Sequence, residues 1–352
     1  MEDQLIALFQ QHMDVVDVQL LPEDMLMFEG RLHEPQDENA EQLLEATANL
    51  GFYLHTTEID DGMVRAVLIP RPKTKKSNPW INIVLFVLTL ASTLAVGAMQ
   101  EGVNIFAQPW LIYKGLAFSL SIMFILLVHE MGHYFASKLH NVEATLPYFI
   151  PFPSLIGTMG AVIRIKSPIP TRKALMDIGA AGPIAGMLVA LPLTFVGLKL
   201  SQVVPTQGLA GSFQLGSSLL YQFLSWLALG KLPPGHDVVL HPIAFAGWIG
   251  FFITALNLLP IGQLDGGHVA YAMLGRKHKY VAWAMWGLLI VGGIFWAGWW
   301  LWAVLVLVFG IKHPPPLAAT VQLDAKRKII GWVCLALFVL TVMPVPFSVV
   351  PG

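Results

Sequence analysis

The first 70 residues alternate apolar and polar positions over short stretches, which is typical of a small mixed domain. We predict two helices, each followed by a pair of strands, at 3–12, 15–31, 37–50 and 52–70. The turn Asp60-Asp61-Gly62 suits a hairpin tip. The repeated order of helix, strand and strand favours a ferredoxin-like or related α+β sandwich for a domain of residues 1–70.

After a short basic linker at 71–79, the pattern changes to long apolar runs, and residues 80–350 form a second domain. The runs lie at 80–98, 116–137, 174–198, 240–262, 280–311 and 329–349. Each is long enough for the roughly 20 residues that cross a membrane. As one helix, 280–311 would measure about 48 Å against a hydrocarbon core of about 30 Å. We therefore predict two short helices there, turning near Gly292-Gly293 or Ala297-Gly298, and six to seven spans in a polytopic α-helical membrane protein.

Two further segments are apolar but broken. Prolines and glycines interrupt 144–170, which then alternates from Ile163 to Lys166, and this favours a re-entrant strand pair on the cytoplasmic side. An ordinary interfacial loop is the alternative. The outer loop 200–238 contains an apolar stretch, 217–229, that suits the membrane surface.

The composition is typical of a membrane protein, and the two parts of the chain have opposite net charges. Hydrophobic residues make up 55% and charged residues 12%, against about 25% charged in soluble domains. The net charge of −1 hides −13 in residues 1–70 and +12 in the remainder. The positive-inside rule puts the acidic head in the cytoplasm, and Met1-Glu2-Asp3-Gln4 has no signal-peptide character. We expect an integral multi-pass protein of a prokaryotic cell membrane that binds lipid and no nucleic acid.

The candidate chemistry lies inside the second apolar run. His129-Glu130-Met131-Gly132-His133 is an H-E-x-x-H pattern, which on a helix directs both imidazoles at one metal and places the glutamate beside the metal-bound water. Charged groups at such depth cost about 2.5–3.5 kcal/mol each, so a role is expected. The alternative is a polar cluster that joins helices. The helix preceding His129 is about 20 Å long, which places a metal near the cytoplasmic third of the membrane.

A catalytic zinc needs a third protein ligand, typically a carboxylate. Only seven acidic residues lie outside the head. Asp265 is the best candidate because it follows a helix that Asn257 and Pro260 break, and exposed backbone at that depth needs a watered, protein-lined cavity. Asp177 is the rival, which we interpret as a packing or interfacial residue. His140 and His268 are expected to make tertiary polar contacts. The single cysteine, Cys334, excludes intramolecular disulfides and cysteine metal clusters.

At this point the chain resembles the site-2 protease family of intramembrane zinc metalloproteases. The motifs that carry the resemblance are His129-Glu130-Met131-Gly132-His133, Asn257-Leu258-Leu259-Pro260 and Leu264-Asp265-Gly266-Gly267. The stretch Phe28-Glu29-Gly30-Arg31-Leu32 loosely resembles the plastid and cyanobacterial branch. The outer loop is too short for a PDZ domain, and no CBS module follows the last apolar run.

The resemblance implies one Zn²⁺ per chain held by His129, His133 and Asp265, with Glu130 as general base. Asn257 would bind substrate backbone or the oxyanion; its alternative is a helix-end cap. The strand pair would lie beside the metal and hold an extended substrate.

The expected activity is endopeptidase cleavage of single-span membrane proteins near the cytoplasmic face, as in regulated intramembrane proteolysis. A catalytically silent membrane chaperone or scaffold of the same fold is the alternative, against which the intact Glu130 argues. A metal transporter would need further ligand pairs, and none is evident in the sequence. The acidic head is expected either to regulate substrate access or to serve as a passive cap, and the oligomeric state is left open.

Overall fold

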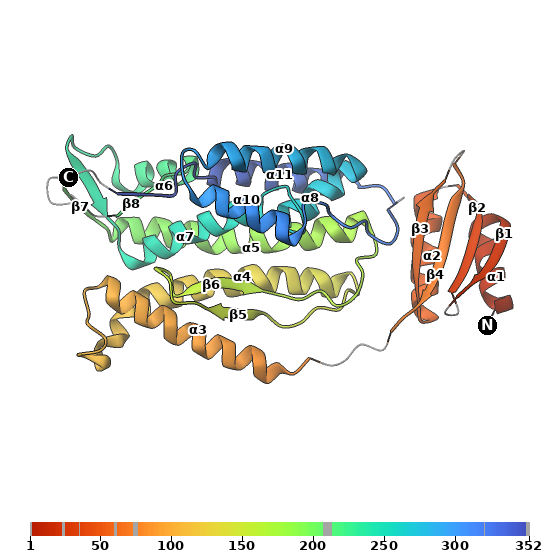
Figure 1. The fold of residues 1–352 in the computed structure, drawn as a ribbon, viewed down its shortest axis with the longest axis horizontal. Coiled ribbons are helices and arrows are strands. Elements are labelled where there is room, and N and C mark those ends of the chain that lie inside the picture. The colour runs from red at the N-terminus through yellow and green to blue at the C-terminus, as the bar shows by residue number, and fades with distance from the viewer. Residues whose placement is uncertain are drawn as a thin grey trace.

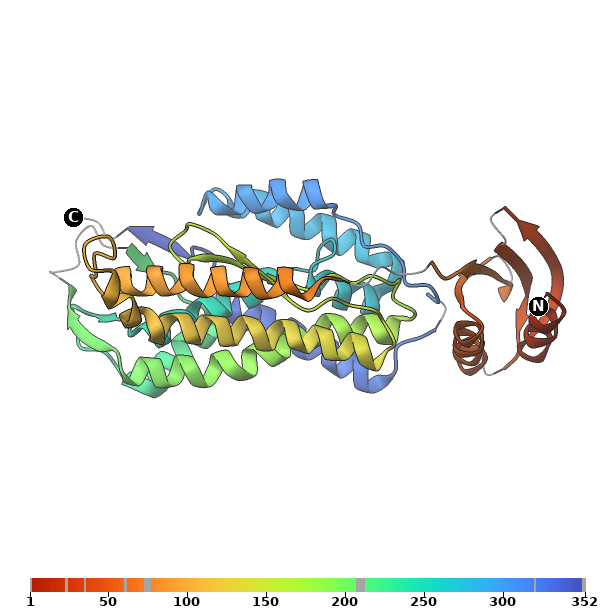
Figure 2. The same ribbon diagram turned by 90° about the horizontal axis from the view of Figure 1, so that it is seen from below.

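The protein is elongated, with a bundle of long helices and a small sheet domain at one end (Figures 1 and 2). A computed structural model describes residues 2–22, 25–34, 36–59, 62–72, 77–206, 213–319 and 321–349. The chain begins in the sheet domain and reaches its C-terminus at the opposite end of the bundle.

The head contains the six elements that the alternating pattern predicts: α1 (Glu2–His12), β1 (Met13–Leu21), β2 (Met25–Leu32), α2 (Gln36–Asn49), β3 (Phe52–Glu58) and β4 (Val64–Pro70). Its sheet has the order β1-β2-β4-β3 with antiparallel neighbours throughout. β4 lies between β2 and β3, which α2 connects, and this is the split arrangement of ferredoxin-like sheets. Phe9 stacks on Phe28 at 3.9 Å in its core. Asp60 and Asp61 of the predicted turn lie outside the described residues, as do 73–76 of the linker.

The head is completed by a distant segment between the last two helices. Ala318 and Val321 are fully buried in the core cluster of the head. The amide of Thr56 in β3 donates to the carbonyl of Leu317 at 2.8 Å, while the amide of Leu317 donates to Ile169 at 3.0 Å. Leu317, Ala318 and Val321 therefore join the head to the bundle, and the prediction of a domain formed by residues 1–70 alone did not include them.

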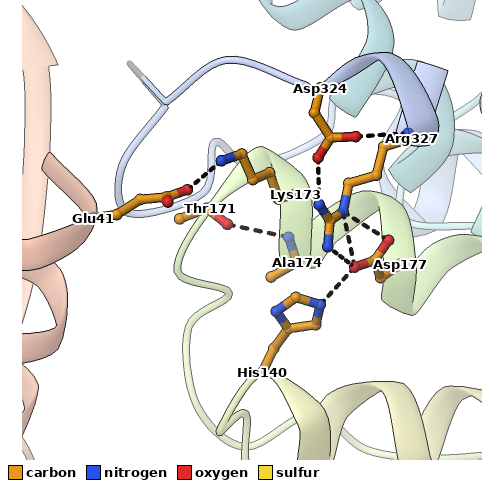
Figure 3. Close-up of polar contacts among 8 residues, drawn as sticks. All are labelled: Glu41, His140, Thr171, Lys173, Ala174, Asp177, Asp324 and Arg327. Atoms are coloured by element: carbon orange, nitrogen blue, oxygen red, sulfur yellow. Dashed lines mark hydrogen bonds and ion pairs between the residues drawn. The ribbon is translucent and has the colours of Figure 1, made fainter. Parts of the chain in front are cut away.

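Polar side chains add to this junction. Lys173 Nζ lies 2.6 Å from Glu41 Oε1 of α2 (Figure 3). The amide of Gln322 donates to Asp37 Oδ1 at 3.1 Å. Two acidic side chains of the head thus bind groups outside it: Glu41 pairs with the ammonium of Lys173, and Asp37 accepts from the backbone amide of Gln322.

Three helices among the described residues are long and apolar enough to cross a membrane. They are α3 (Pro79–Gln100), α4 (Leu116–Leu139) with the 3₁₀ turn Pro109–Gly115 before it, and α5 (Arg172–Lys199). Asn78 and Thr171 cap α3 and α5 through side-chain oxygens. α4 and α5 approach closely at Gly132, where a β-carbon would lie 2.5 Å from the carbonyl oxygen of Ala181.

The later helices are shorter, and the predicted six to seven spans therefore stay a prediction. They are α7 (Pro242–Asn257), α8 (Asp265–Leu274), α9 (His278–Gly292), α10 (Gly298–Phe309) and α11 (Ala325–Thr341). The apolar run 280–311 forms two helices, as predicted, with the turn between Gly292 and Gly298. They pair as an antiparallel hairpin in which the indoles of Trp286 and Trp300 donate to the carbonyls of Ala303 and Ile290.

The last apolar run is not one helix, which corrects the sequence interpretation. α11 ends at Thr341, because the prolines at 344 and 346 cannot continue it. The chain then forms β10 (Phe347–Val349), which pairs with β8 (Phe213–Leu215) in the expected outer loop. That loop also contains the strand pair β7 (Gln202–Pro205) and β9 (His236–Val239). Its predicted apolar stretch forms α6 (Leu219–Leu229).

The predicted strand pair in 144–170 is present and is shorter than expected. β5 (Tyr148–Pro151) pairs with β6 (Thr158–Val162) next to α3 (Figure 1). Asn82 Nδ2 donates to the carbonyls of Leu146 and Pro147, and Ser92 Oγ donates to Gly157 at 2.6 Å. The alternating residues after Val162 contribute a single bridge, between Ile165 and Ala144.

Candidate metal centre

The structure brings three of the predicted ligands together. His129 and His133 are one turn apart on α4, buried, with their Nε2 atoms 3.1 Å apart. Asp265 places Oδ1 at 3.3 Å from His133 Nε2 and Oδ2 at 3.3 Å from His129 Nε2. In the described residues this is the one group of three or more such side chains close enough to hold a metal ion.

Two glycines explain how Asp265 reaches this position. Asp265 is the first residue of α8, directly after an irregular segment that follows α7. A β-carbon on Gly266 would lie 2.0 Å from the carbonyl oxygen of Leu258, and one on Gly267 would lie 2.3 Å from that of Gly262. Only glycine allows the first turn of α8 to approach that backbone so closely. The two glycines after Asp265 therefore allow the bend that brings its carboxylate to this position.

Neighbouring groups fix the orientation of His133. Its Nδ1 lies 2.7 Å from the carbonyl oxygen of Ile178 on α5, so Nδ1 carries the proton and Nε2 keeps its lone pair for a ligand bond. Gly182 faces the same ring, and Gly186 faces that of His129. Gly182 and Gly186, one turn apart on α5, thus allow close packing against the pair of histidines.

The donor set fits zinc. Ligand atoms about 2.0–2.2 Å from a tetrahedral zinc lie about 3.3–3.6 Å from one another. Here the two Nε2 atoms are 3.1 Å apart, and each lies 3.3 Å from a different oxygen of Asp265. Apart from this contact with His129, the buried Oδ2 of Asp265 has no polar partner among the described residues, and a cation beside it would offset the cost of its burial. Two neutral imidazoles and one carboxylate are also a common catalytic zinc set.

Two further predicted residues border this cluster. Glu130 is 5% exposed, its Oε1 lies 4.0 Å from His129 Nε2, and its carboxyl is hydrogen-bonded to the backbone of Ile163. Asn257, the last residue of α7, places Nδ2 3.2 Å from His129 Nε2. The carboxylate of Glu130 and the amide group of Asn257 thus both lie beside the ligand nitrogen of His129.

These side chains open into a cavity of about 950 Å³. One wall is the extended segment that leaves β6, contributing five consecutive residues from Ala161 to Ile165. Tyr148 of β5 and Phe309 of α10 complete the rim. Extended backbone therefore runs directly beside the candidate metal ligands.

The structure places the rival residues elsewhere. The carboxylate of Asp177 accepts hydrogen bonds from His140 Nε2 at 2.7 Å and from Arg327 Nη2 at 2.6 Å (Figure 3). Arg327 also pairs with Asp324, which caps α11. His268 lines the cavity, with its Nδ1 2.9 Å from the carbonyl oxygen of Leu264. Asp177, His140 and His268 are thus not part of the cluster of ligand atoms.

Sequence reasoning missed the groups that act through the backbone. The carbonyl of Ile178 and the backbone of Ile163 contact His133 and Glu130, and no residue type signals such a role. Gly182 and Gly186 could have been assigned to the site only if α5 had been known to cross α4 at the H-E-x-x-H turn.

Comparison with known proteins agrees with this site. The profile of Peptidase family M50 matches residues 117–293, which include both histidines, Glu130, Asn257 and Asp265. The chain is 32% identical over 297 residues to an Arabidopsis thaliana protein named "Probable zinc metalloprotease EGY1, chloroplastic", covering 75% of this chain and 53% of that one. It is also 32% identical over 312 residues to the Arabidopsis protein named "Probable zinc metalloprotease EGY2, chloroplastic", covering 84% of this chain and 55% of that one.

A rice relative extends the match toward the head. The EGY2 protein of Oryza sativa subsp. indica is 30% identical over 348 residues, or 93% of this chain and 63% of that protein. The chain thus spans between about half and two thirds of these relatives. No solved structure matches significantly. The resemblance to the plastid-type branch is confirmed by these relatives, and the chain belongs to peptidase family M50, the site-2 protease family of membrane-embedded metallopeptidases.

Proposed function

We propose that this protein is an intramembrane zinc endopeptidase that cleaves single-span membrane proteins near the cytoplasmic face. One Zn²⁺ per chain would be held by His129, His133 and Asp265. The observation that carries the proposal is the convergence of these three donors, with Glu130 beside them, at α4, a helix apolar enough to cross a membrane.

The chemistry follows from the positions of the side chains. A zinc ion held by these ligands would bring the pKa of a bound water close to neutrality. Glu130 would act as general base toward the attacking water and as general acid toward the leaving amine, a role worth about 10²–10⁴ in rate. Asn257 Nδ2 points at the same place and donates a hydrogen bond to the substrate carbonyl or the oxyanion.

The substrate binds as an extended strand. A peptide bond inside a helix is shielded by its own hydrogen bonds, so the scissile stretch has to unwind. The backbone of residues 161–165 lines the cavity, and an added strand would hydrogen-bond to it while the scissile carbonyl faces His129 and His133.

The orientation follows the distribution of basic residues, with the head in the cytoplasm. The relatives are named as chloroplastic, and they give no support to a prokaryotic origin. We propose an integral membrane location and a regulatory role for the head, which rests on the bundle through Glu41, Asp37 and β3.

A panel of single-span fusion proteins, co-reconstituted in liposomes with the purified protein, tests the proposal. Mass spectrometry of the products should place the cut inside the apolar segment, on the side of the head. The Glu130→Ala variant should bind zinc and leave the panel intact. A silent chaperone or scaffold would instead bind the fusions, and neither native protein nor variant would cut any of them.

A further inference from the structure

A second cavity, larger than the one at the metal centre, lies between the head and the bundle. Its volume is about 1030 Å³, close to the upper end of the range of about 300–1,000 Å³ that is usual for small-molecule sites. The head contributes five consecutive residues, His55 to Ile59, at the end of the edge strand β3. The bundle contributes the end of α8, the start of α9 and the segment after α10.

The lining of this cavity is strongly cationic. It includes one acidic residue, Glu58, and five basic ones: Arg172, Arg276, Lys277, Lys279 and Lys312. The guanidinium of Arg172 donates to the carbonyls of Ala272 and Met273, and Lys279 lies over the ring of Tyr280. Within the described residues, Arg276, Lys277 and Lys312 form no ion pair.

The local backbone adds to this positive field. α9 begins at His278, Lys277 precedes it without a side-chain cap, and the first turn contains no acidic residue. Helix N-termini carry a partial positive charge that favours anions. Arg276, Lys277 and Lys279 lie at this end of α9, so their charges repel one another and the helix terminus unless an anion is bound.

Two histidines that line the cavity each have a buried Nε2 without a hydrogen-bond partner among the described residues. His278 is 2% exposed, and its Nε2 makes no hydrogen bond among the described residues. His313, which lines the cavity too, has a buried Nε2 in the same condition. Buried nitrogens of this kind are normally satisfied by a protein group, a water or a ligand.

We propose that this cavity binds a phosphate-bearing ligand that bridges the head and the bundle. Lys277, Lys312 and Arg276, which line the cavity, would pair with the phosphate oxygens. A compact group with more than one negative charge matches several converging cations better than a single carboxylate does. The same chemistry is offered by a free polyphosphate and by the headgroup of an anionic phospholipid.

Protein purified in a neutral detergent allows the two sources to be distinguished. One arm titrates inorganic tripolyphosphate and measures binding by calorimetry. The other adds short-chain phosphatidylglycerol or phosphatidylcholine and counts retained molecules by native mass spectrometry. We expect one tripolyphosphate, or one phosphatidylglycerol in preference to phosphatidylcholine, per chain, with an affinity that falls as salt rises.

Paired variants separate this cavity from the general basic rim. Lys277→Ala with Lys312→Ala should weaken binding at least about tenfold, because charge-assisted hydrogen bonds are lost. Lys326→Ala with Lys328→Ala removes the same charge from exposed positions that border none of the large cavities and should leave binding unchanged. Failure of both probes to bind, or equal weakening by the two double variants, would overturn the proposal.

Discussion

Gly182 of α5 lies against the imidazole of His133 so closely that a β-carbon at Gly182 would be 2.0 Å from His133 Nε2. That nitrogen is one of the three candidate ligand atoms. The packing of α5 on α4 and the geometry of the metal centre are therefore the same contact.

Gly182→Ala should damage the metal centre while the fold survives. The added methyl group has to displace the His133 ring, because α4 and α5 are held together along their length. We expect zinc affinity to fall at least about tenfold, as when groups that orient metal ligands are lost. Competition with a chelator measures this. Gly287→Ala in α9, where a β-carbon would meet nothing within 4 Å, is the matched control and should bind zinc like the native protein.

The two partly buried aspartates Asp177 and Asp265 should differ in their effect on metal content. Asp265→Asn removes the charged ligand, so the purified variant should contain much less than one zinc per chain. Asp177→Asn should keep its zinc, because Asp177 pairs with His140 and Arg327 instead. Elemental analysis of both variants gives the answer, and full zinc content in Asp265→Asn would contradict the ligand assignment.

Arg327 connects α11 to α5 by pairing with both Asp324 and Asp177. Arg327→Met should lower the free energy of unfolding by about 1–3 kcal/mol, since the partly buried carboxylate of Asp177 then keeps only His140 as a partner. Lys326→Met, next to it and exposed, should cost less than about 0.5 kcal/mol. Unfolding in detergent monitored by tryptophan fluorescence compares them.

The same junction has a pH dependence. The backbone amide of Arg327, followed by its guanidinium, holds the pKa of Asp324 below its usual range. A lowered pKa means that this contribution is complete above the unfolded value of about 3.9 and is lost as the pH falls through the folded value. Because the Met variant keeps the backbone amide at position 327, only the part due to the guanidinium differs between the two proteins. The native protein should lose that part of its advantage over Arg327→Met at acidic pH, and a constant difference down to pH 2 would contradict this pairing.

Removing residues 2–70 should weaken the bundle as well as the proposed regulation. Ala318 and Val321 are buried in the head cluster and would become exposed, and Lys173 would lose Glu41. We expect a lower unfolding temperature, and an altered cleavage rate or substrate choice that is most evident at low salt. If stability, rate and substrate choice were all unchanged, the head would be a passive cap.

The metal ligands could be predicted from the sequence because their signals are local and rare. The i, i+4 histidines need only a helix, and Asp265 is conspicuous beside two glycines and a broken helix. The head elements followed from alternation within short segments. What escaped prediction depends on contacts between distant segments: the strand pairing of Phe347 with Leu215, Ala318 and Val321 in the head core, and the carbonyl of Ile178 at His133.

Zinc content and cleavage, measured on the same preparations of native protein and Glu130→Gln, test the central claim most directly. The amide keeps the size of the side chain but cannot accept the proton. The account predicts one zinc per chain in both proteins, and cleavage of a single-span fusion slowed by about 10²-fold or more in the variant. Cleavage at the native rate by a zinc-loaded Glu130→Gln protein would contradict it.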